Sequence, residues 1–227
     1  MEIKPIAFFK SPFAEKFGIP RQAGLSPSVK GSIVFDPEYR NQEAVRGLEG
    51  FDYIWLIWGF SANKPRTAPA DKTRFQSTVR PPRLGGNERV GVFASRSPFR
   101  PNSLGLSAVK VESIGEGPVI HVLGADLMDG TPIYDIKPYV TYADSHPDAR
   151  SSFVDERVWE PLEVSFPDCP VPDGLDLDAL REVLSQDPRP RYHSDSQKVY
   201  GMSFNGCEVR FRVEEGIVQV VSIESIH

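Results

Sequence analysis

Acidic side chains cluster near the middle of the chain, where polar segments interrupt apolar ones. Asp126 and Asp135 flank the segment 129–132, Asp-Gly-Thr-Pro, whose composition is typical of a tight turn. A turn accounts for that segment by itself, whereas the two flanking carboxylates could face a common cleft and bind a cation or accept a proton. Lys137 and Tyr139 follow closely. These residue types permit cation binding or proton transfer and leave both readings open.

Arginines beside prolines are the second chemical feature. Arg80 and Arg83 bracket two prolines, and Arg96 and Arg100 flank the segment Ser-Pro-Phe. A stiffened backbone loses little entropy on binding, and a guanidinium group forms bidentate contacts with phosphate or carboxylate. We therefore predict an anion-binding surface here; the alternative is that these arginines pair with acids of the same chain.

The charge of the chain is segregated. The formal net charge is −5, yet residues 72–100 contain seven basic residues and one acid, and residues 155–187 contain ten acids and two arginines. Such segregation indicates an anionic partner, such as nucleic acid, at the basic part. Pairing between the basic and acidic segments would explain it equally well.

Several classes of protein are not supported. No apolar run is long enough to cross a bilayer and the N-terminus does not resemble a signal peptide, so we expect a cytoplasmic protein without membrane association. The two cysteines and four histidines are scattered, so no metal site is expected. Rossmann, P-loop and nucleophile-elbow motifs are absent from the sequence.

Strand-like segments dominate the first two thirds of the chain. The segment 51–60 is the most apolar, and its aromatic and β-branched content predicts a buried central strand, with a buried helix as the weaker alternative. One helix is predicted from Asp36 to about Leu48. Strands and helices do not alternate, which argues for a mainly β, antiparallel fold. The other predicted strands span 3–9, 32–35, 90–94, 104–114 and 118–123.

The remainder of the chain predicts a small α+β domain. The segment 177–185 has apolar residues at helical spacing, and Asn205-Gly206 is a strong hairpin signal inside a three-stranded meander. An acidic, proline-rich stretch precedes this part. We therefore predict a first domain over 1–145, a connector over 146–170 and a C-terminal domain over 171–227.

Six strings, in order along the chain, resemble one family. They are Pro20-Arg-Gln22, Arg80-Pro-Pro-Arg-Leu-Gly-Gly-Asn87, Gly91-Val-Phe-Ala-Ser-Arg-Ser-Pro-Phe-Arg-Pro-Asn102, Asp126-Leu-Met-Asp-Gly-Thr-Pro132, Asp135-Ile-Lys-Pro-Tyr139 and Asp187-Pro-Arg-Pro-Arg-Tyr192. Together they resemble the TrmO (TsaA-like) family of S-adenosylmethionine-dependent tRNA methyltransferases. The resemblance implies a small antiparallel β-barrel with one or two short helices, a homodimer, and N6-methylation of threonylcarbamoyladenosine at tRNA position 37.

The resemblance also implies site residues. One departure is that Ser61-Ala62 stands where close family members carry His-Gln, which keeps open an alternative function as a non-catalytic tRNA-binding or cofactor-sensing module. For the base that takes the N6 proton we consider Asp126, Asp135 and Tyr139. The predicted cofactor contacts are Pro20, Arg21, Gln22, Ser61, Ala62, Arg96, Leu106, Leu127, Met128, Asp129, Gly130 and Thr131, and the predicted tRNA contacts are Arg80, Arg83, Arg100, Asn102, Lys137, Arg189 and Arg191.

Overall fold

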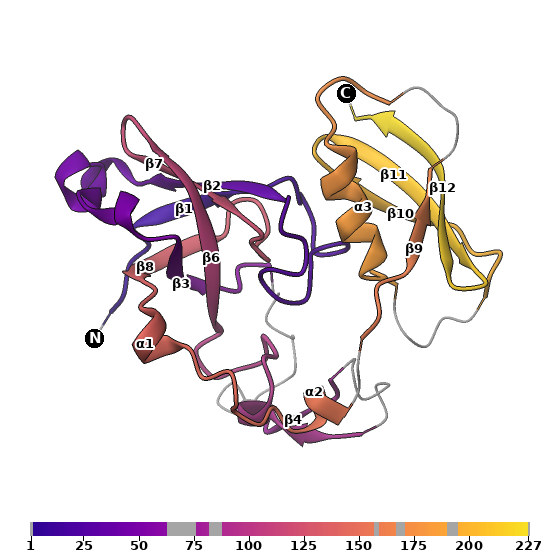
Figure 1. The fold of residues 1–227 in the computed structure, drawn as a ribbon, viewed down its shortest axis with the longest axis horizontal. Helices are drawn as coiled ribbons and strands as arrows, with labels where there is room; N and C mark the ends of the chain where they lie inside the picture. The colour runs from indigo at the N-terminus through magenta and orange to yellow at the C-terminus, as the bar shows by residue number, and fades with distance from the viewer. Residues whose placement is uncertain are drawn as a thin grey trace, which may run out of the picture.

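Two hydrophobic cores organise the chain, one inside a β-barrel and one beneath a smaller sheet. Figure 1 shows the barrel and the smaller sheet that contain them. The structure, a computed structural model, describes residues 2–62, 76–81, 88–156, 159–166, 171–189 and 195–226. The prediction of a mainly β, antiparallel barrel with a small C-terminal α+β domain is confirmed.

Six antiparallel strands close the barrel in the order β1-β2-β7-β6-β3-β8. Side chains alternate between the barrel interior and its outer surface, as the pleat of a strand requires. The strands are β1 (Ala7–Lys10), β2 (Lys30–Phe35), β3 (Tyr53–Gly59), β6 (Leu104–Gly115), β7 (Val119–Leu123) and β8 (Pro132–Pro138).

Strand β3 lies between β6 and β8 and supplies much of the barrel core. Ile54, Leu56 and Trp58 are buried, while the intervening residues are partly exposed. The predicted central strand is confirmed, and the alternative of a buried helix is wrong. Strand β8 was not predicted, because its alternating pattern is short and lies inside segments that read as polar loops.

The predicted helix from Asp36 to Leu48 is wrong. Three short 3-10 turns occupy this stretch: η1 (Pro37–Tyr39), η2 (Gln42–Val45) and η3 (Leu48–Gly50). The side chains of Asp36 and Asn41 each accept from a backbone N–H two residues later, and this local bonding competes with a continuous helix. Gly47, with a left-handed φ of 85°, interrupts the stretch again.

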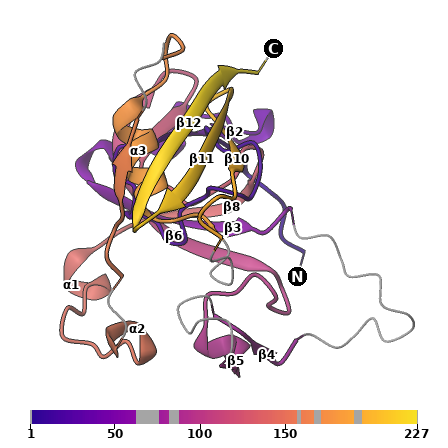
Figure 2. The ribbon, with the colours of Figure 1, turned by 90° about the vertical axis from the view of Figure 1, so that its right-hand side faces the viewer.

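A small two-stranded ribbon lies apart from the barrel (Figure 2). It consists of β4 (Thr78–Val79) and β5 (Val90–Gly91) and is followed by the turn η5 (Val92–Ala94). The predicted strand over 90–94 is therefore only two residues long. Two further short helices, α1 (Thr141–Asp144) and α2 (Phe153–Glu156), follow the barrel.

The C-terminal sheet has the order β10-β11-β12-β9, and helix α3 (Leu177–Ser185) packs against it. Asn205 and Gly206 have φ angles of 50° and 74°, as a tight hairpin requires. The connector contributes a strand that the sequence did not predict, β9, parallel to β12. The strands are β9 (Glu163–Ser165), β10 (Tyr200–Phe204), β11 (Cys207–Glu214) and β12 (Ile217–Ser225).

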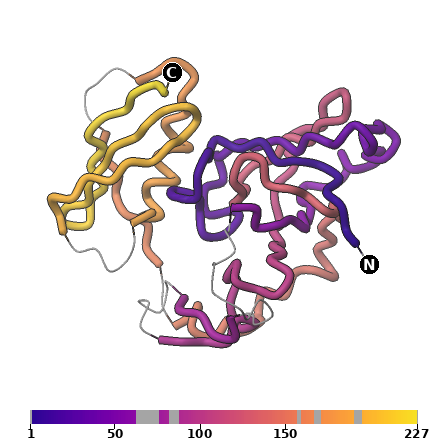
Figure 3. The backbone as a smooth tube through the Cα atoms, turned by 180° about the vertical axis from the view of Figure 1, so that it is seen from behind, coloured from indigo at the N-terminus to yellow at the C-terminus, as the bar shows by residue number. Residues whose placement is uncertain are grey.

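Residues 11–29, here called the bridging segment, connect β1 to β2 and also enter the C-terminal core (Figure 3). Phe13 is fully buried there and its ring packs edge-on against Phe204 at 5.5 Å. Ser28 donates from its backbone N–H and its hydroxyl to Glu182 of α3, at 2.8 and 2.7 Å. The same stretch of chain is therefore part of both structural units.

Candidate functional site

Predicted site residues from distant parts of the chain meet at one end of the barrel, where β3 ends and β6 begins. The backbone N–H of Phe60 donates to the carbonyl of Ser103 at 3.0 Å. This hydrogen bond places Ser61 and Ala62 beside the first residues of β6. Antiparallel pairing of the two strands thus brings together segments that are more than forty positions apart.

Asp126 is the meeting point of three further segments. Its Oδ1 accepts a hydrogen bond of 2.6 Å from the Ser107 hydroxyl on β6. The backbone N–H of Ala23, in the bridging segment, also donates to the Asp126 carboxylate, and the Arg96 guanidinium lies close enough to stabilise its negative charge. Arg96 in turn donates to the side-chain oxygen of Gln22. The structure therefore brings together Gln22, Arg96 and Asp126, three of the residues to which the sequence assigned a role.

The carboxylate of Asp126 lies in a poorly hydrated environment. Burial raises the pKa of the Asp126 carboxyl above its ordinary value of 3.8, while the hydrogen bond from Ser107, the backbone N–H donors and the Arg96 charge act in the opposite direction. A desolvated carboxylate attracts a nearby cation strongly and accepts a proton more readily than an exposed one. Both properties suit a reacting site.

Ser107 is a candidate site residue that the sequence patterns did not predict. It is buried, and it faces the barrel interior among apolar neighbours. The available signal was a hydroxyl at an inward position of a strand whose other inward residues are apolar. Leu106, the next residue, points outward with 57% of its surface exposed. The cofactor contact predicted for Leu106 would therefore lie on the outer wall of the barrel.

The loop before β8 contains the predicted residues 127–131. The Leu127 side chain is buried in the barrel core, which leaves only its backbone available to a ligand. Gly130 has a left-handed φ of 73°, and the buried Thr131 hydroxyl donates to the carbonyl of Met128 at 2.7 Å. These features make a tight, well-fastened turn.

Asp129 fastens this turn to the bridging segment. Its Oδ1 accepts from the backbone N–H of Ser11 at 3.1 Å, and its own N–H donates to the carbonyl of Phe13 at 2.9 Å. Its other oxygen lies 3.7 Å from the Lys10 ammonium. The contacts of Asp129 are those of a turn residue, in agreement with the simpler interpretation of the sequence.

Asp135 and Tyr139 do not lie with Asp126. Asp135 pairs with Ile57 on the outer face of the barrel wall, and its carboxylate lies 3.5 Å from the ammonium of Lys137. Tyr139 lies at the other end of β3, with its ring centroid 5.6 Å from that of Trp55. Among the three predicted bases, only Asp126 adjoins the other converging segments.

The predicted tRNA contacts have different surroundings. Arg100 braces the turn before it, because its Nη1 donates to the carbonyls of Ser95 at 2.7 Å and Val92 at 3.3 Å. Arg80 and Asn102 are exposed, as is Lys137. Arg83 and Arg191 lie outside the residues that the structure describes.

Arg189 binds an acid of its own chain. Its Nε and Nη2 donate to the two carboxylate oxygens of Asp187 at 2.8 and 3.0 Å, and both side chains are less than one fifth exposed. This hydrogen bonding raises the pKa of the Arg189 guanidinium. The bidentate pair occupies the edge of the guanidinium that a phosphate would otherwise use.

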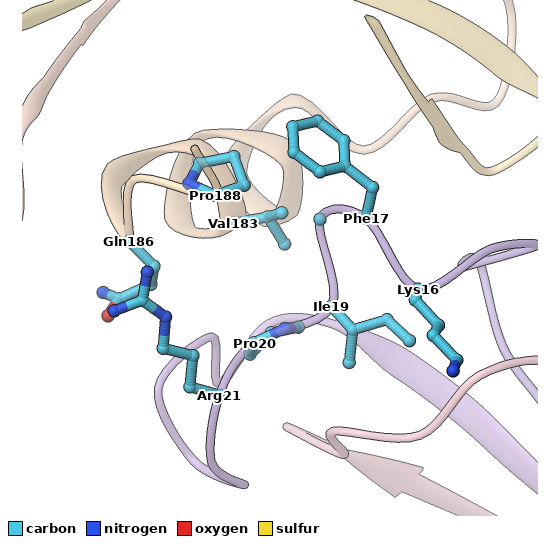
Figure 4. Close-up of a pocket in the computed structure, with 9 residues that line it drawn as sticks. Lys16, Phe17, Ile19, Pro20, Arg21, Val183, Gln186 and Pro188 are labelled. Carbon is cyan, nitrogen blue, oxygen red and sulfur yellow. The ribbon is translucent and has the colours of Figure 1, made fainter. Parts of the chain in front are cut away.

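A cavity of about 200 Å³ lies where the bridging segment meets α3 (Figure 4). Phe17, Ile19 and Pro20 line it from one side and Val183 and Pro188 from the other. Charged and polar side chains complete its wall: Lys16, Arg21 and Gln186. Two of the predicted cofactor-binding residues, Pro20 and Arg21, are therefore also part of the junction between the two units.

Two other features are absent from the residues that the structure describes. Within 2–62, 76–81, 88–156, 159–166, 171–189 and 195–226, no group of three or more His, Cys, Asp or Glu side chains is placed to hold a metal ion. In the same ranges, no helix is long and apolar enough to cross a membrane.

Comparisons with known proteins agree with the sequence resemblance over the whole chain. A tRNA (adenine(37)-N6)-methyltransferase of Escherichia coli is 39% identical over 98% of this chain and 97% of its own length. The Pseudomonas aeruginosa protein RcsF is 37% identical over 92% of this chain and 91% of its own length. Its name describes it as an S-adenosylmethionine-dependent methyltransferase. A crystal structure of TrmO from Pseudomonas aeruginosa aligns with a TM-score of 0.78 and 29% identity, covering 99% of this chain and 98% of that one.

Two family models divide the chain between them. The tRNA-methyltransferase O N-terminal domain matches residues 8–145, which contain the barrel and the convergence around Asp126. The TrmO C-terminal domain matches residues 172–226, which contain α3 and the strands β10 to β12. On this evidence the chain belongs to the TrmO family.

Proposed function

We infer that this chain transfers a methyl group from S-adenosylmethionine to N6 of adenosine 37 in tRNA. One relative that matches it over nearly its full length is named for that activity, and another is named for S-adenosylmethionine-dependent methyl transfer. The observation in this chain that carries the inference is the convergence of Ser107 and Arg96 on the half-buried carboxylate of Asp126, with Gln22 bonded to Arg96. We further propose that the adenosine already bears a threonylcarbamoyl group on N6.

The residues at the site fit the chemical groups of the cofactor. S-adenosylmethionine, when bound, supplies an electrophilic methyl group on a positively charged sulfur. The Asp126 carboxylate stabilises positive charge, and the Arg96 guanidinium suits a carboxylate. The exposed side chains of Phe93 and Leu106 offer apolar surface of the kind that an adenine ring covers. We assign the other predicted cofactor residues to the same site.

Asp126 has the properties of the proton acceptor. The nitrogen that receives the methyl group must lose a proton, and a carbonyl substituent on N6 makes that proton more acidic. Burial raises the pKa of the Asp126 carboxyl, which improves the strength of the carboxylate as a base. Neither Asp135 nor Tyr139 adjoins the converging segments, so we propose Asp126 for this role.

We propose that tRNA lies against the basic part of the barrel unit, where Arg80, Asn102 and Lys137 are exposed. Positive charge there attracts phosphates and positions the substrate. The exposed apolar side chain of Phe8 on the barrel wall also favours a homodimer, with a second copy of the chain covering it. Light scattering on the purified chain tests the dimer. We place the reaction in the cytoplasm and assign it no metal.

A methylation assay tests the proposed activity. Full-length protein is incubated with S-adenosylmethionine carrying a labelled methyl group and with two tRNAs, one bearing threonylcarbamoyladenosine and one unmodified transcript. Analysis of the nucleosides should find the label in methylated threonylcarbamoyladenosine, from the modified tRNA alone.

Two variants serve as a matched pair in this assay. Asp126→Asn should slow methylation strongly. Asp129→Asn should remain close to wild type, because an amide oxygen can still accept from the N–H of Ser11. Binding of tRNA and cofactor without any transfer of label by the wild-type protein would contradict the proposed activity.

A further inference from the structure

A hydrogen-bonded chain runs through the barrel core to the Asp126 carboxylate. The indole Nε1 of Trp58 donates to the Ser107 hydroxyl at 3.0 Å, and that hydroxyl donates to Asp126 Oδ1 at 2.6 Å. Trp58 and Ser107 are only 7% and 4% exposed. The three groups come from β3, from β6 and from the loop before β8, so the closed barrel is what assembles them.

The chain of hydrogen bonds has a fixed direction. An indole N–H can donate but cannot accept, so the Ser107 oxygen must be the acceptor in its bond with Trp58. The single hydroxyl proton of Ser107 is then available to Asp126, and an ionised carboxylate is an acceptor only. The separation of 2.6 Å is typical of a bond between a hydroxyl and a charged carboxylate. The arrangement therefore favours the ionised form of Asp126.

The neighbouring residues are shaped to hold this arrangement. Gly105 is paired with Trp58, and a Cβ atom at residue 105 would overlap the indole ring. Phe60 packs edge-on against the same indole, with ring centroids 4.4 Å apart. Other inward positions of these two strands, such as Ile54 and Val109, are apolar. Packing alone therefore explains neither the indole N–H nor the hydroxyl at this point of the core.

We propose that Trp58 and Ser107 are positioning residues for methyl transfer, which together orient one oxygen of Asp126 and keep this carboxylate ready to accept a proton. This proposal rests on the proposed function, since it assigns the two residues to the same site. Neither residue needs to touch the cofactor or the tRNA. Ser107 acts on the site through Asp126, and Trp58 acts through Ser107.

The groups that face Asp126 determine how its titration should respond. Ser107 faces it from β6, the Ala23 N–H from the bridging segment, and the Arg96 charge from the segment after η5. All three favour the carboxylate, whereas burial opposes it. Loss of the Ser107 bond removes a group that favours the ionised form, so the pKa of Asp126 should rise. The acidic limb of the activity profile should then move to higher pH.

Variants of Ser107 and Trp58 test the proposal through the pH profile of kcat/KM. Ser107→Ala and Trp58→Phe should each move the acidic limb to higher pH. At low pH, Ser107→Ala should lower kcat about tenfold or more, as expected for loss of a hydrogen bond to a charged group, and Trp58→Phe should lower it less, because its bond is to a neutral hydroxyl. The KM for S-adenosylmethionine should stay within about twofold, because neither side chain contacts the ligand directly. Ser107→Thr retains the hydroxyl and should restore the wild-type profile.

A double variant tests whether Trp58 acts on Asp126 through Ser107. In a Ser107→Ala background, Trp58→Phe should have no further effect on the profile, because its only route to Asp126 has been removed. Ile54→Val, on the same strand and in the same core, serves as the matched control that lowers stability without touching the chain of hydrogen bonds. Profiles of both single variants that superimpose on the Ile54→Val profile would overturn the proposal.

Direct titration of the Asp126 carboxyl group tests this proposal independently of the proposed function. The carboxyl carbon of Asp126 can be followed by NMR in protein labelled at aspartate and assigned with Asp126→Asn. The Asp126 titration should move to higher pH in Ser107→Ala and Trp58→Phe, and an unchanged titration would refute the positioning role. Absence of methyl transfer by the wild-type protein would refute the proposed function and leave this readout intact.

Discussion

At the scale of single residues, two aspartates in one loop have different tasks. Asp126 is held by Ser107 in a poorly hydrated place, whereas Asp129 ties the loop to Ser11 and is close to Lys10 at the surface. Buried polar groups that stabilise a reaction commonly reduce stability, because the folded state must carry a desolvated charge. Substitutions of these two aspartates should therefore differ in their effect on the stability of the protein as well as on its activity.

We predict that Asp126→Asn is more stable than the wild type at pH 7. Burial raises the folded-state pKa of Asp126 above 3.8, so the wild type loses stability as the pH rises through that folded-state pKa. The variant carries no charge at this position and avoids the loss. Its advantage in thermal unfolding temperature should shrink as the pH falls through the folded-state pKa and should vanish below 3.8. An advantage that grows toward acid pH would contradict the sign of this argument.

A second prediction at this scale concerns Arg96, which is exposed yet joined to Gln22 and close to Asp126. Arg96→Ala should lower kcat/KM by about ten- to hundredfold, since hydrogen bonds to charged groups contribute roughly 1.5–3 kcal/mol. Arg46→Ala is the matched control, because Arg46 is also exposed and pairs with Glu43, three residues away on the same turn. Unaltered turnover and cofactor affinity in a folded Arg96→Ala protein would remove this loop from the site.

At the scale of elements, the barrel is completed by local hydrogen bonds as well as by strand pairing. The short helix α1, which follows β8, is fastened by Asp144. Asp144 Oδ2 accepts from the Val140 N–H at 2.8 Å and from the Trp55 indole N–H at 3.0 Å. These bonds lower the pKa of the Asp144 carboxyl, the backbone N–H contributing most. One side chain therefore links α1 to the outer face of β3.

This link predicts a pH-dependent effect of Asp144→Ala. Because the folded-state pKa of Asp144 is depressed, its contribution to stability is present above 3.8 and is lost as the pH falls through the folded-state value. Asp144→Ala should therefore unfold at a lower temperature than the wild type at pH 7. The two unfolding temperatures should approach each other in acid, and a constant gap across that range would contradict the prediction.

At the scale of the whole molecule, the bridging segment makes the two units dependent on each other. Phe13 and Phe17 insert into the C-terminal core, where the Phe17 ring lies 6.5 Å from Tyr200 and 6.4 Å from Phe211. A few residues later, Gln22 reaches Arg96 of the candidate site. The C-terminal unit therefore helps to order a segment to which we assign cofactor contacts.

We accordingly predict that Phe17→Ala weakens the binding of S-adenosylmethionine although Phe17 lies outside the candidate site. When the binding-competent conformation of a segment is less populated, the apparent Kd rises by the same factor. Calorimetry on the full-length chain measures this change. Val220→Ala is the control, because Val220 belongs to the same C-terminal core but lies on β12 and not in the bridging segment. Equal cofactor affinities for the two variants would show that the segment does not depend on Phe17.

The sequence by itself determined the fold class, the central strand 51–60, the helix 177–185 and the Asn-Gly hairpin. These features depend on local periodicity and turn chemistry, which a linear pattern expresses directly. It also indicated the site segments, because their strings resemble a family in which they occur together. The helix over 36–48 was wrong because capping side chains at Asp36 and Asn41 formed local turns instead.

Only the tertiary structure decided which of the predicted residues meet. Barrel closure set Asp126 beside Ser107 and Arg96, while strand register turned Asp135 outward and left Tyr139 at the opposite end of β3. The tertiary structure also paired Arg189 with Asp187 and placed Phe13 in the C-terminal core. Each of these outcomes depends on contacts between distant parts of the chain and on the direction in which a side chain points, and neither is expressed in the spacing of residues along the sequence.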